Sequence, residues 1–287
     1  MAQRQVEGGG RLTATYIVLL LVTGAGAGFA SGMLGVGAGS IMVPVIYWVI
    51  TDMGVSPDIA IRVAFGTSLL VILPTATSGA WRHNRNGAVH WKVALVLGSS
   101  GLVGALAGST LASFLPGNVL EIGLGGLLLA AALWVGLRQR IMSKPGKERG
   151  AGVDFLIKDA RWLSAVCGFP IGIVVGLSGL GGGVLMVPVL VLIFHFPIHL
   201  AIGTSLASIA FTSLGGIIGY ILHGIGTSPL PYSIGYINVL VWLCLVATSS
   251  PLAQLGAKAT HALPAKYLHY LFITFVVYAG FRMIGVF

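Results

Sequence analysis

Two glycine-rich stretches of the chain are nearly copies of each other. Residues 32–44 read GMLGVGAGSIMVP, and residues 176–188 read GLSGLGGGVLMVP. The stretches align without a gap, four glycines of the first match glycines of the second, and both end in Met-Val-Pro. The agreement extends farther along the chain, where residues 66–69 and 203–206 both read Gly-Thr-Ser-Leu. The two halves of the chain are therefore an internal duplication.

The whole chain has the composition of a membrane protein. Of its 287 residues, 56% are hydrophobic and 8% are charged, and the mean hydropathy is +0.97. Ordinary soluble domains carry roughly 25% charged residues, so a soluble globular enzyme is excluded. The net charge of +9 comes from short clusters between apolar runs. Such clusters are typical of membrane topology signals, so we expect a lipid bilayer as partner and no nucleic acid.

The apolar runs define two sets of five segments separated by a polar stretch. They lie at about 15–33, 35–50, 58–80, 91–114 and 118–137 in the first half, and at about 162–178, 181–197, 199–224, 236–257 and 268–287 in the second. A straight helix over residues 15–50 would be about 54 Å long, far more than the roughly 30 Å hydrocarbon core of a bilayer. The chain must therefore break at Gly35–Gly39 and fold back.

These lengths predict an all-α integral membrane protein built from two inverted repeats of five helical segments each. The first two segments of each repeat form a Gly-broken hairpin, and internal repeats of this kind are common in secondary transporters. The predicted parts are a polar tail at 1–14, the first transmembrane repeat at 15–137, a cytoplasmic linker at 138–161 and the second transmembrane repeat at 162–287.

The distribution of cations predicts the orientation. The hairpin topology places about 12 of the 16 Lys and Arg residues on the side of the linker, so the positive-inside rule puts the linker in the cytoplasm and both termini outside. Treating each broken pair as one crossing gathers a similar share of cations on one side, so segment length and the mirrored repeat decide for the hairpin. No cleavable signal peptide is evident, and we expect a multi-pass protein of the bacterial plasma (inner) membrane.

The doubled Gly-rich element, followed in each half by Gly-Thr-Ser-Leu, resembles the TauE/SafE family of membrane transporters, also called the sulfite exporter or toluene-sulfonate-uptake family. The resemblance covers essentially the whole chain after the first dozen residues. The first element departs from the fuller pattern at Ala38, where the second has Gly182. The resemblance implies transport of sulfite, thiosulfate, a small organosulfonate such as sulfoacetate, or other carboxylated or sulfur-containing solutes. Outward transport rests on the resemblance alone.

The candidate binding site combines backbone and hydroxyl groups near the middle of the membrane. Glycines between two short helices let the backbone approach a solute, and N–H groups at the start of the following helix can bind an anion. Hydroxyls on the next segment can donate to anion oxygens. Alternatively, the glycines permit tight helix crossing and the hydroxyls bond to their own or a neighbouring helix. The predicted substrate-binding residues are Gly37, Gly39, Ser40, Thr67, Ser68, Gly181, Gly183, Thr204 and Ser205.

Other polar residues give weaker signals. Pro44 and Pro188 are expected to kink the second arm of each hairpin. Glu121, near a segment end, and His223 are minor candidates for proton coupling. Lys258 is interpreted mainly as a topology cation, with attraction of an anion to the cytoplasmic mouth as the alternative.

No metal site, disulfide or cofactor is expected. His195 and His199 are four residues apart, but Pro197 between them prevents the helical two-ligand geometry of a zinc site. Cys167 and Cys244 lie in apolar runs without metal-ligand spacing and are interpreted as small core residues.

The sequence therefore predicts a secondary transporter that exports a small sulfur-containing anion by alternating access. Uptake of a related anion is the alternative within the transport class. An anion channel or an integral membrane enzyme is a further alternative, but the sequence offers no cluster of acid, base and nucleophile, so no enzyme activity is expected. No sequence feature specifies the oligomeric state or the coupling ion.

Overall fold

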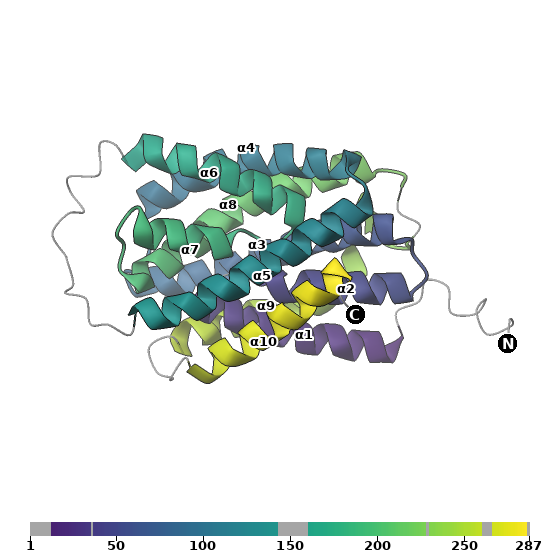
Figure 1. Ribbon diagram of the computed structural model, residues 1–287, viewed down its shortest axis with the longest axis horizontal. Coiled ribbons are helices and arrows are strands. Elements are labelled where there is room, and N and C mark those ends of the chain that lie inside the picture. The colour runs from purple at the N-terminus through teal and green to yellow at the C-terminus, as the bar shows by residue number, and fades with distance from the viewer. Residues whose placement is uncertain (1–12, 36, 143–159, 228–229, 260–265, 286–287) are drawn as a thin grey trace, which may run out of the picture.

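The computed structural model describes residues 13–35, 37–142, 160–227, 230–259 and 266–285. Within these ranges the chain forms ten helices and one short antiparallel ribbon (Figure 1). The first half contains α1 (Ala14–Leu34), α2 (Gly39–Asp52), α3 (Pro57–Arg85), α4 (Trp91–Phe114) and α5 (Gly117–Met142). The second half contains α6 (Ala160–Ser178), α7 (Gly183–Leu192), α8 (Ile198–Gly224), β1 (Ser233–Ile234), β2 (Ile237–Asn238), α9 (Val239–Ala259) and α10 (Lys266–Ile284). The predicted all-α fold class is confirmed.

The lengths of the helices fit a multi-pass membrane protein. Among the described residues, α1, α3, α4, α8 and α9 are long and apolar enough to cross a bilayer. The arms α2 and α7 are shorter, as expected for the second arms of broken hairpins, and they contain Pro44 and Pro188. The helices α1 and α6 both stop at a glycine with positive φ, Gly35 at +68° and Gly179 at +66°. A left-handed residue of this kind ends a helix, which explains why both hairpins break at the same place in the repeat.

Each half packs its first helix against the fourth helix of the other half. The contact between α1 and α9, like that between α6 and α4, is made by glycines spaced four residues apart, which lie on one helix face. A β-carbon on any of them would lie within 2.6 Å of a carbonyl oxygen of the partner helix, so only glycine lets these helices meet. The glycines are Gly24, Gly28 and Gly32 in α1, and Gly168, Gly172 and Gly176 in α6.

The central helices α3 and α8 pack on each other and run antiparallel. Gly79 of α3 contacts Leu206 near the start of α8, whereas Gly216, later in α8, contacts Leu69 of α3. The glycines of α1 lie, in chain order, against residues that also follow in chain order along α9, so these two helices run parallel. The pairs are Gly24 with Leu245, Gly28 with Ser249 and Gly32 with Ala253. The same holds for α6 and α4. Accordingly, α1 and α6 begin at opposite ends of the bundle (Figure 1).

Two local features differ from the sequence-based expectation. The helix α7 ends at Leu192, although the apolar run continues to residue 197. The chain turns there because His195 has φ of 52° and Pro197 precedes the first residue of α8. The two-stranded ribbon before α9, in which Ser233 pairs with Asn238, was not predicted because each strand has only two residues.

Candidate functional site

The two Gly-rich breaks pack directly against each other. A β-carbon on Gly37 would lie 2.9 Å from the carbonyl oxygen of Leu180, and one on Gly39 would lie 2.6 Å from that of Gly179. Gly37 and Gly181 also share a positive φ, +85° and +81°. Both conditions require glycine, because a side chain would collide with the opposite backbone or strain its own. The predicted glycines of the two halves are therefore brought together in backbone contact.

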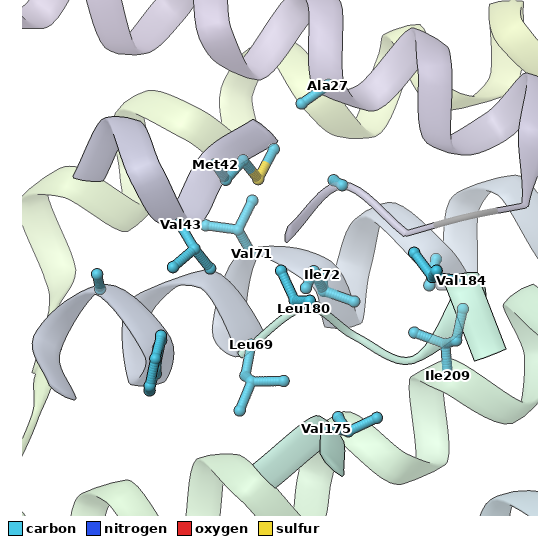
Figure 2. Packing of buried hydrophobic residues seen from close by; sticks show 14 of the residues in the cluster. Ala27, Met42, Val43, Leu69, Val71, Ile72, Val175, Leu180, Val184 and Ile209 are labelled. Carbon is cyan, nitrogen blue, oxygen red and sulfur yellow. The ribbon is translucent and has the colours of Figure 1, made fainter. Parts of the chain in front are cut away.

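We call the place where the breaks Gly35–Gly39 and Gly179–Gly183 meet the crossing. Apolar side chains close the space around it (Figure 2). Leu180 of the second break lies beside Ile72 of α3, with Met42 of α2 and Val184 of α7 nearby. All four side chains are buried, with at most 7% of their surface exposed. The crossing is therefore tightly closed in this conformation.

The serine of each Gly-Thr-Ser-Leu motif donates a hydrogen bond to the break of the other half. The hydroxyl of Ser68 in α3 donates to the carbonyl of Gly179 at 3.0 Å, and the hydroxyl of Ser205 in α8 donates to the carbonyl of Gly35 at 3.2 Å. Both side chains are fully buried. Each half thus holds the break of the other half through an equivalent hydrogen bond.

The threonines of the same motifs contact helix starts instead of the breaks. The hydroxyl of Thr67 accepts from the N–H of Asn238 at 3.0 Å, and that of Thr204 accepts from the N–H of His90 at 3.0 Å. Asn238 and His90 immediately precede α9 and α4, and each side chain caps its helix. These helices begin at opposite ends of the bundle, so the two threonine hydroxyls are not brought together (Figure 1).

Two helix starts lie at the crossing. The first hydrogen bonds of α7 run from the N–H groups of Leu185 and Met186 to the carbonyl of Gly182. The N–H groups at the start of α7, before Leu185, therefore have no acceptor within the helix. The start of α2 repeats this arrangement with the carbonyl of Ala38 as acceptor. Helix starts carry partial positive charge, which gives the crossing a favourable field for an anion without a cationic side chain.

The two breaks differ in backbone geometry at the position of Ala38. Ala38 has a right-handed helical conformation with φ of −74°, whereas the equivalent Gly182 has φ of +78°. In the first break, the buried hydroxyl of Ser40 donates weakly to the carbonyl of Gly37 at 3.5 Å. The sequence difference at Ala38 therefore corresponds to a real difference in backbone geometry.

A cavity of about 210 Å³ lies beside the second break, between α5, α6 and α7. The hydroxyl of Ser178 in its wall donates to the carbonyl of Val174 at 2.7 Å. The lining is almost entirely apolar, so the cavity suits an apolar group better than an anion, and it was not predicted from the sequence. The lining residues are Leu127, Ala130, Val174, Val175, Ser178, Leu180, Gly182, Val184, Leu185 and Pro188.

The minor proton-coupling candidates have local partners. The carboxylate of Glu121 at the start of α5 accepts from the hydroxyl of Tyr47 in α2 at 2.6 Å. The Nδ1 atom of His223 lies 2.9 Å from the carbonyl of Gly219, one turn earlier in α8. Neither residue belongs to the crossing.

The residues considered for metal binding or a disulfide do not form a site within the described part of the chain. His195 and His199 are exposed at the turn before α8 and at its start. Cys167 and Cys244 are free and half-buried against the core. In the residue ranges that the structure describes, no group of three or more His, Cys, Asp or Glu side chains could hold a metal ion.

A helical membrane bundle whose centre is formed by two broken hairpins is the architecture of a transport protein. The family model "Sulfite exporter TauE/SafE" matches residues 20–283, and the chain therefore belongs to this family. Over 285 residues, the chain is 29% identical to a probable membrane transporter protein of Haemophilus influenzae, with 94% of this chain and 98% of the relative aligned.

Two further relatives come from other organisms. A probable membrane transporter protein of Methanocaldococcus jannaschii is 26% identical over 267 residues, with 93% of this chain and 94% of the relative aligned. The probable membrane transporter protein YunE of Bacillus subtilis is 26% identical over 275 residues, with 93% and 97% aligned. No solved structure matches the chain. The chain is thus a multi-pass membrane transporter.

Proposed function

We propose that this protein is a secondary transporter that exports a small sulfur-containing anion, sulfite or an organosulfonate such as sulfoacetate, across the plasma membrane. Membership of the sulfite exporter family supports both the substrate class and the direction. The observation that carries the proposal is the crossing of two broken hairpins, which places backbone N–H groups and hydroxyls where the two halves meet. Such a site suits a compact oxyanion.

The two halves act as inverted repeats in this proposal. The contacts between α1 and α9 and between α6 and α4 are equivalent under exchange of the halves, and α3 and α8 run antiparallel. This arrangement supports an axis in the membrane plane, about which one half rocks against the other. The linker at 138–161 and the α3–α4 loop then face the cytoplasm, and both termini face outward.

The anion binds where the breaks now touch. In the described conformation Gly37 and Gly39 contact the second break directly, so binding requires the two breaks to separate. The hydroxyls of Ser68 and Ser205 then exchange a carbonyl partner for an anion oxygen. The proposed binding residues at the breaks are Gly37, Gly39, Ser40, Ser68, Gly181, Gly183 and Ser205. Thr67 and Thr204 also belong to the proposed set, but their hydroxyls bond helix starts in the described conformation and must change partners to reach the anion.

Alternating access follows from this exchange of partners. Each helix start contributes roughly 0.3–1 kcal/mol toward binding an anion at an exposed site, and more where water is excluded. When the anion leaves, the serine hydroxyls return to their carbonyl partners and the crossing closes. Because the crossing is closed, it supports a carrier that moves between states and argues against a continuously open channel.

Counterflow in liposomes tests the substrate class. Purified protein is reconstituted in vesicles loaded with sulfite, thiosulfate, sulfoacetate, taurine or a simple carboxylate, and uptake of labelled anion is followed. We expect saturable exchange of at least one sulfur-containing anion. Equal flux of every anion, or no flux of any sulfur compound, contradicts the proposed substrate. Export of the accepted anion from preloaded cells, compared with cells lacking the protein, tests the direction.

A further inference from the structure

Three cations lie close together where α3 ends and α4 begins. Arg82 and Arg85 are in the last turn of α3, and Lys92 is in the first turn of α4. The indole N–H of Trp91 donates to the side-chain oxygen of Asn84 at 2.8 Å, which links the two helix ends. Arg85 and Lys92 are the chain neighbours of this pair. We call Arg82, Arg85 and Lys92 the loop cations.

The described residues supply no carboxylate to the loop cations. The carboxylates in the described ranges lie at the opposite end of α3, where Asp58 is in its first turn and accepts from the N–H of Gly117 at the start of α5. Asp52 ends α2 just before α3, and Glu121 is in the second turn of α5. Residues 143–159, outside the described ranges, contain four Lys or Arg against three Asp or Glu, so that stretch brings no net negative charge.

The two arginines present donors that the described residues leave unused. The guanidinium carbon of Arg85 lies 3.9 Å from the centre of the Trp81 ring, so stacking holds the guanidinium while its N–H edge stays available. The Nε atom of Arg82 is buried and has no hydrogen-bond partner in the described part of the chain. A buried donor without an acceptor is costly, so Arg82 favours an acceptor that comes from outside the chain.

Exposed tryptophans surround the loop cations at one level of the bundle. The side chains of Trp81 and Trp91 are 49% and 44% exposed, and Trp162 in α6 is 79% exposed. Gly168 of α6 lies against Leu97 of the parallel helix α4, and Trp162 and Trp91 each precede these contacts by six residues. The two indoles are therefore at the same depth. Exposed tryptophans at a helix end are typical of the membrane–water interface.

We infer that the loop cations and the adjacent tryptophans form a binding site for the headgroup of an anionic phospholipid such as phosphatidylglycerol. Its phosphate oxygens accept from the guanidinium groups of Arg82 and Arg85, and Lys92 adds a third positive charge. The acyl chains follow the apolar surface that begins at Trp91 and continues one turn later at Leu95, which is 47% exposed. The inference goes beyond the proposed transport function and does not depend on the transported anion.

A phospholipid fits this surface better than a soluble anion does. A soluble phosphate would meet the three charges but would leave the exposed faces of Trp81, Trp91 and Leu95 without a partner. A lipid meets both, because its charged and apolar parts are joined at the membrane surface, where these residues lie. Bound lipid also holds the ends of α3 and α4 together, so binding should stabilise the folded protein.

Lipid competition tests the inference on the purified, delipidated protein. Phosphatidylglycerol and phosphatidylcholine with identical acyl chains are offered in detergent at equal concentration, bound lipid is counted by native mass spectrometry, and thermal unfolding is followed. We expect preferential binding of phosphatidylglycerol and a larger rise in melting temperature with it. Glycerol phosphate, which has the anionic group without acyl chains, should not displace the lipid at the same concentration.

Matched variants separate this site from general attraction of anionic lipid. The double change Arg82→Gln and Arg85→Gln should lower the affinity for phosphatidylglycerol about 25-fold, since each cation near the surface contributes about five-fold. Arg85→Gln alone, at an exposed position, should lower it about five-fold and covers the case in which the double variant does not fold. Arg282→Gln, which removes the cation stacked 4.6 Å from the Trp48 ring, and Lys258→Gln, at the exposed end of α9, should bind as the wild type does.

The outcomes are decisive in both directions. Loss of the phosphatidylglycerol preference in the arginine variants alone supports the site. Equal binding of both lipids by the wild type, an equal loss in Arg282→Gln or Lys258→Gln, or displacement by glycerol phosphate overturns it.

Discussion

Ser68 and Ser205 make the contact that best distinguishes a binding role from a structural one. Each hydroxyl donates to a carbonyl in the opposite half at the crossing, and neither side chain is exposed. By contrast, the hydroxyl of Ser213, two turns later in α8, donates to Ile209 of its own helix. The three serines share burial and helical context, so they differ mainly in what they contact.

Replacing Ser68 or Ser205 by alanine should weaken the apparent affinity for the transported anion by about ten-fold or more, because a lost hydrogen bond to a charged group costs roughly 1.5–3 kcal/mol. Ser213→Ala should leave the affinity unchanged, since its hydroxyl bonds within α8. Concentration dependence of counterflow, together with the amount of folded protein in the membrane, measures both effects. Equal affinities for all three variants would assign the serine hydroxyls a purely structural role.

Gly182→Ala should lower stability far more than Ala38→Gly, the reverse change at the equivalent position of the first half. At Gly182, φ is +78° and a β-carbon would lie 2.5 Å from Val175, so Gly182→Ala should lower stability by about 1–3 kcal/mol. Ala38→Gly keeps a φ that any residue adopts and should cost about 1 kcal/mol or less. Thermal unfolding in detergent compares them, and similar losses would contradict the different geometry of the two breaks.

At the scale of helices, the glycines have two separate tasks. Gly35 and Gly179 end α1 and α6, whereas the four-residue series along the same helices lets α9 and α4 approach. The first task concerns the local backbone and the second concerns a distant partner. Each of these helices thus ends at a break and packs closely along its length against a helix of the other half.

The close contact between α1 and α9 can be tested by substitutions at two nearby positions of α1, Gly28 and Gly26. A β-carbon on Gly28 would overlap the carbonyl oxygen of Ser249 in α9, whereas one on Gly26 would have no neighbour within 4 Å. Gly28→Ala should therefore lower stability by about 1–3 kcal/mol, and Gly26→Ala should be neutral or stabilise by up to about 1 kcal/mol through better helix propensity. Melting temperatures in one detergent measure the difference. A greater loss from Gly26→Ala would refute the α1–α9 packing.

Sequence reasoning was successful where the signal is local. The length of residues 15–50 required a break, and the glycines gave its position. The partners of α1 and α6 were not predicted, because glycines spaced four residues apart reveal a close contact but not the helix that fills it.

For the candidate site, the sequence placed the glycines correctly near one another but did not predict what the hydroxyls do. Contact between Gly37 and the second break is a consequence of the duplicated motif meeting its copy. The partners of Thr67 and Thr204 depend on the packing of α3 against α9 and of α8 against α4, which periodicity does not specify. Their part in anion binding stays a prediction.

At the scale of the whole molecule, the two ends of α3 can be used to test the proposed orientation in the membrane. Helix α3 runs from Pro57 to Arg85, so the residues flanking it, Ser56 and Asn86, lie at opposite ends of the bundle. Both are exposed. We expect the positive-inside rule to place the Asn86 end, which carries Arg82, Arg85 and Lys92, in the cytoplasm.

Single cysteines at Ser56 and Asn86 test this orientation. In cells whose protein lacks Cys167 and Cys244, an impermeant thiol reagent added outside should label Ser56→Cys and leave Asn86→Cys unlabelled. Permeabilised cells serve as the control, because both positions should then react. Selective labelling of Asn86→Cys from outside would reverse the orientation and place the Asn86 end outside.

The exchange of helices between halves also sets the order of biosynthesis. The ribosome completes α1 long before it reaches α9, so the glycine face of α1 has no native partner until most of the chain has entered the membrane. The helices α4 and α6 are both complete much earlier. Insertion of individual helices is therefore separated in time from final assembly, and α1 must wait for α9 before it reaches its native neighbour.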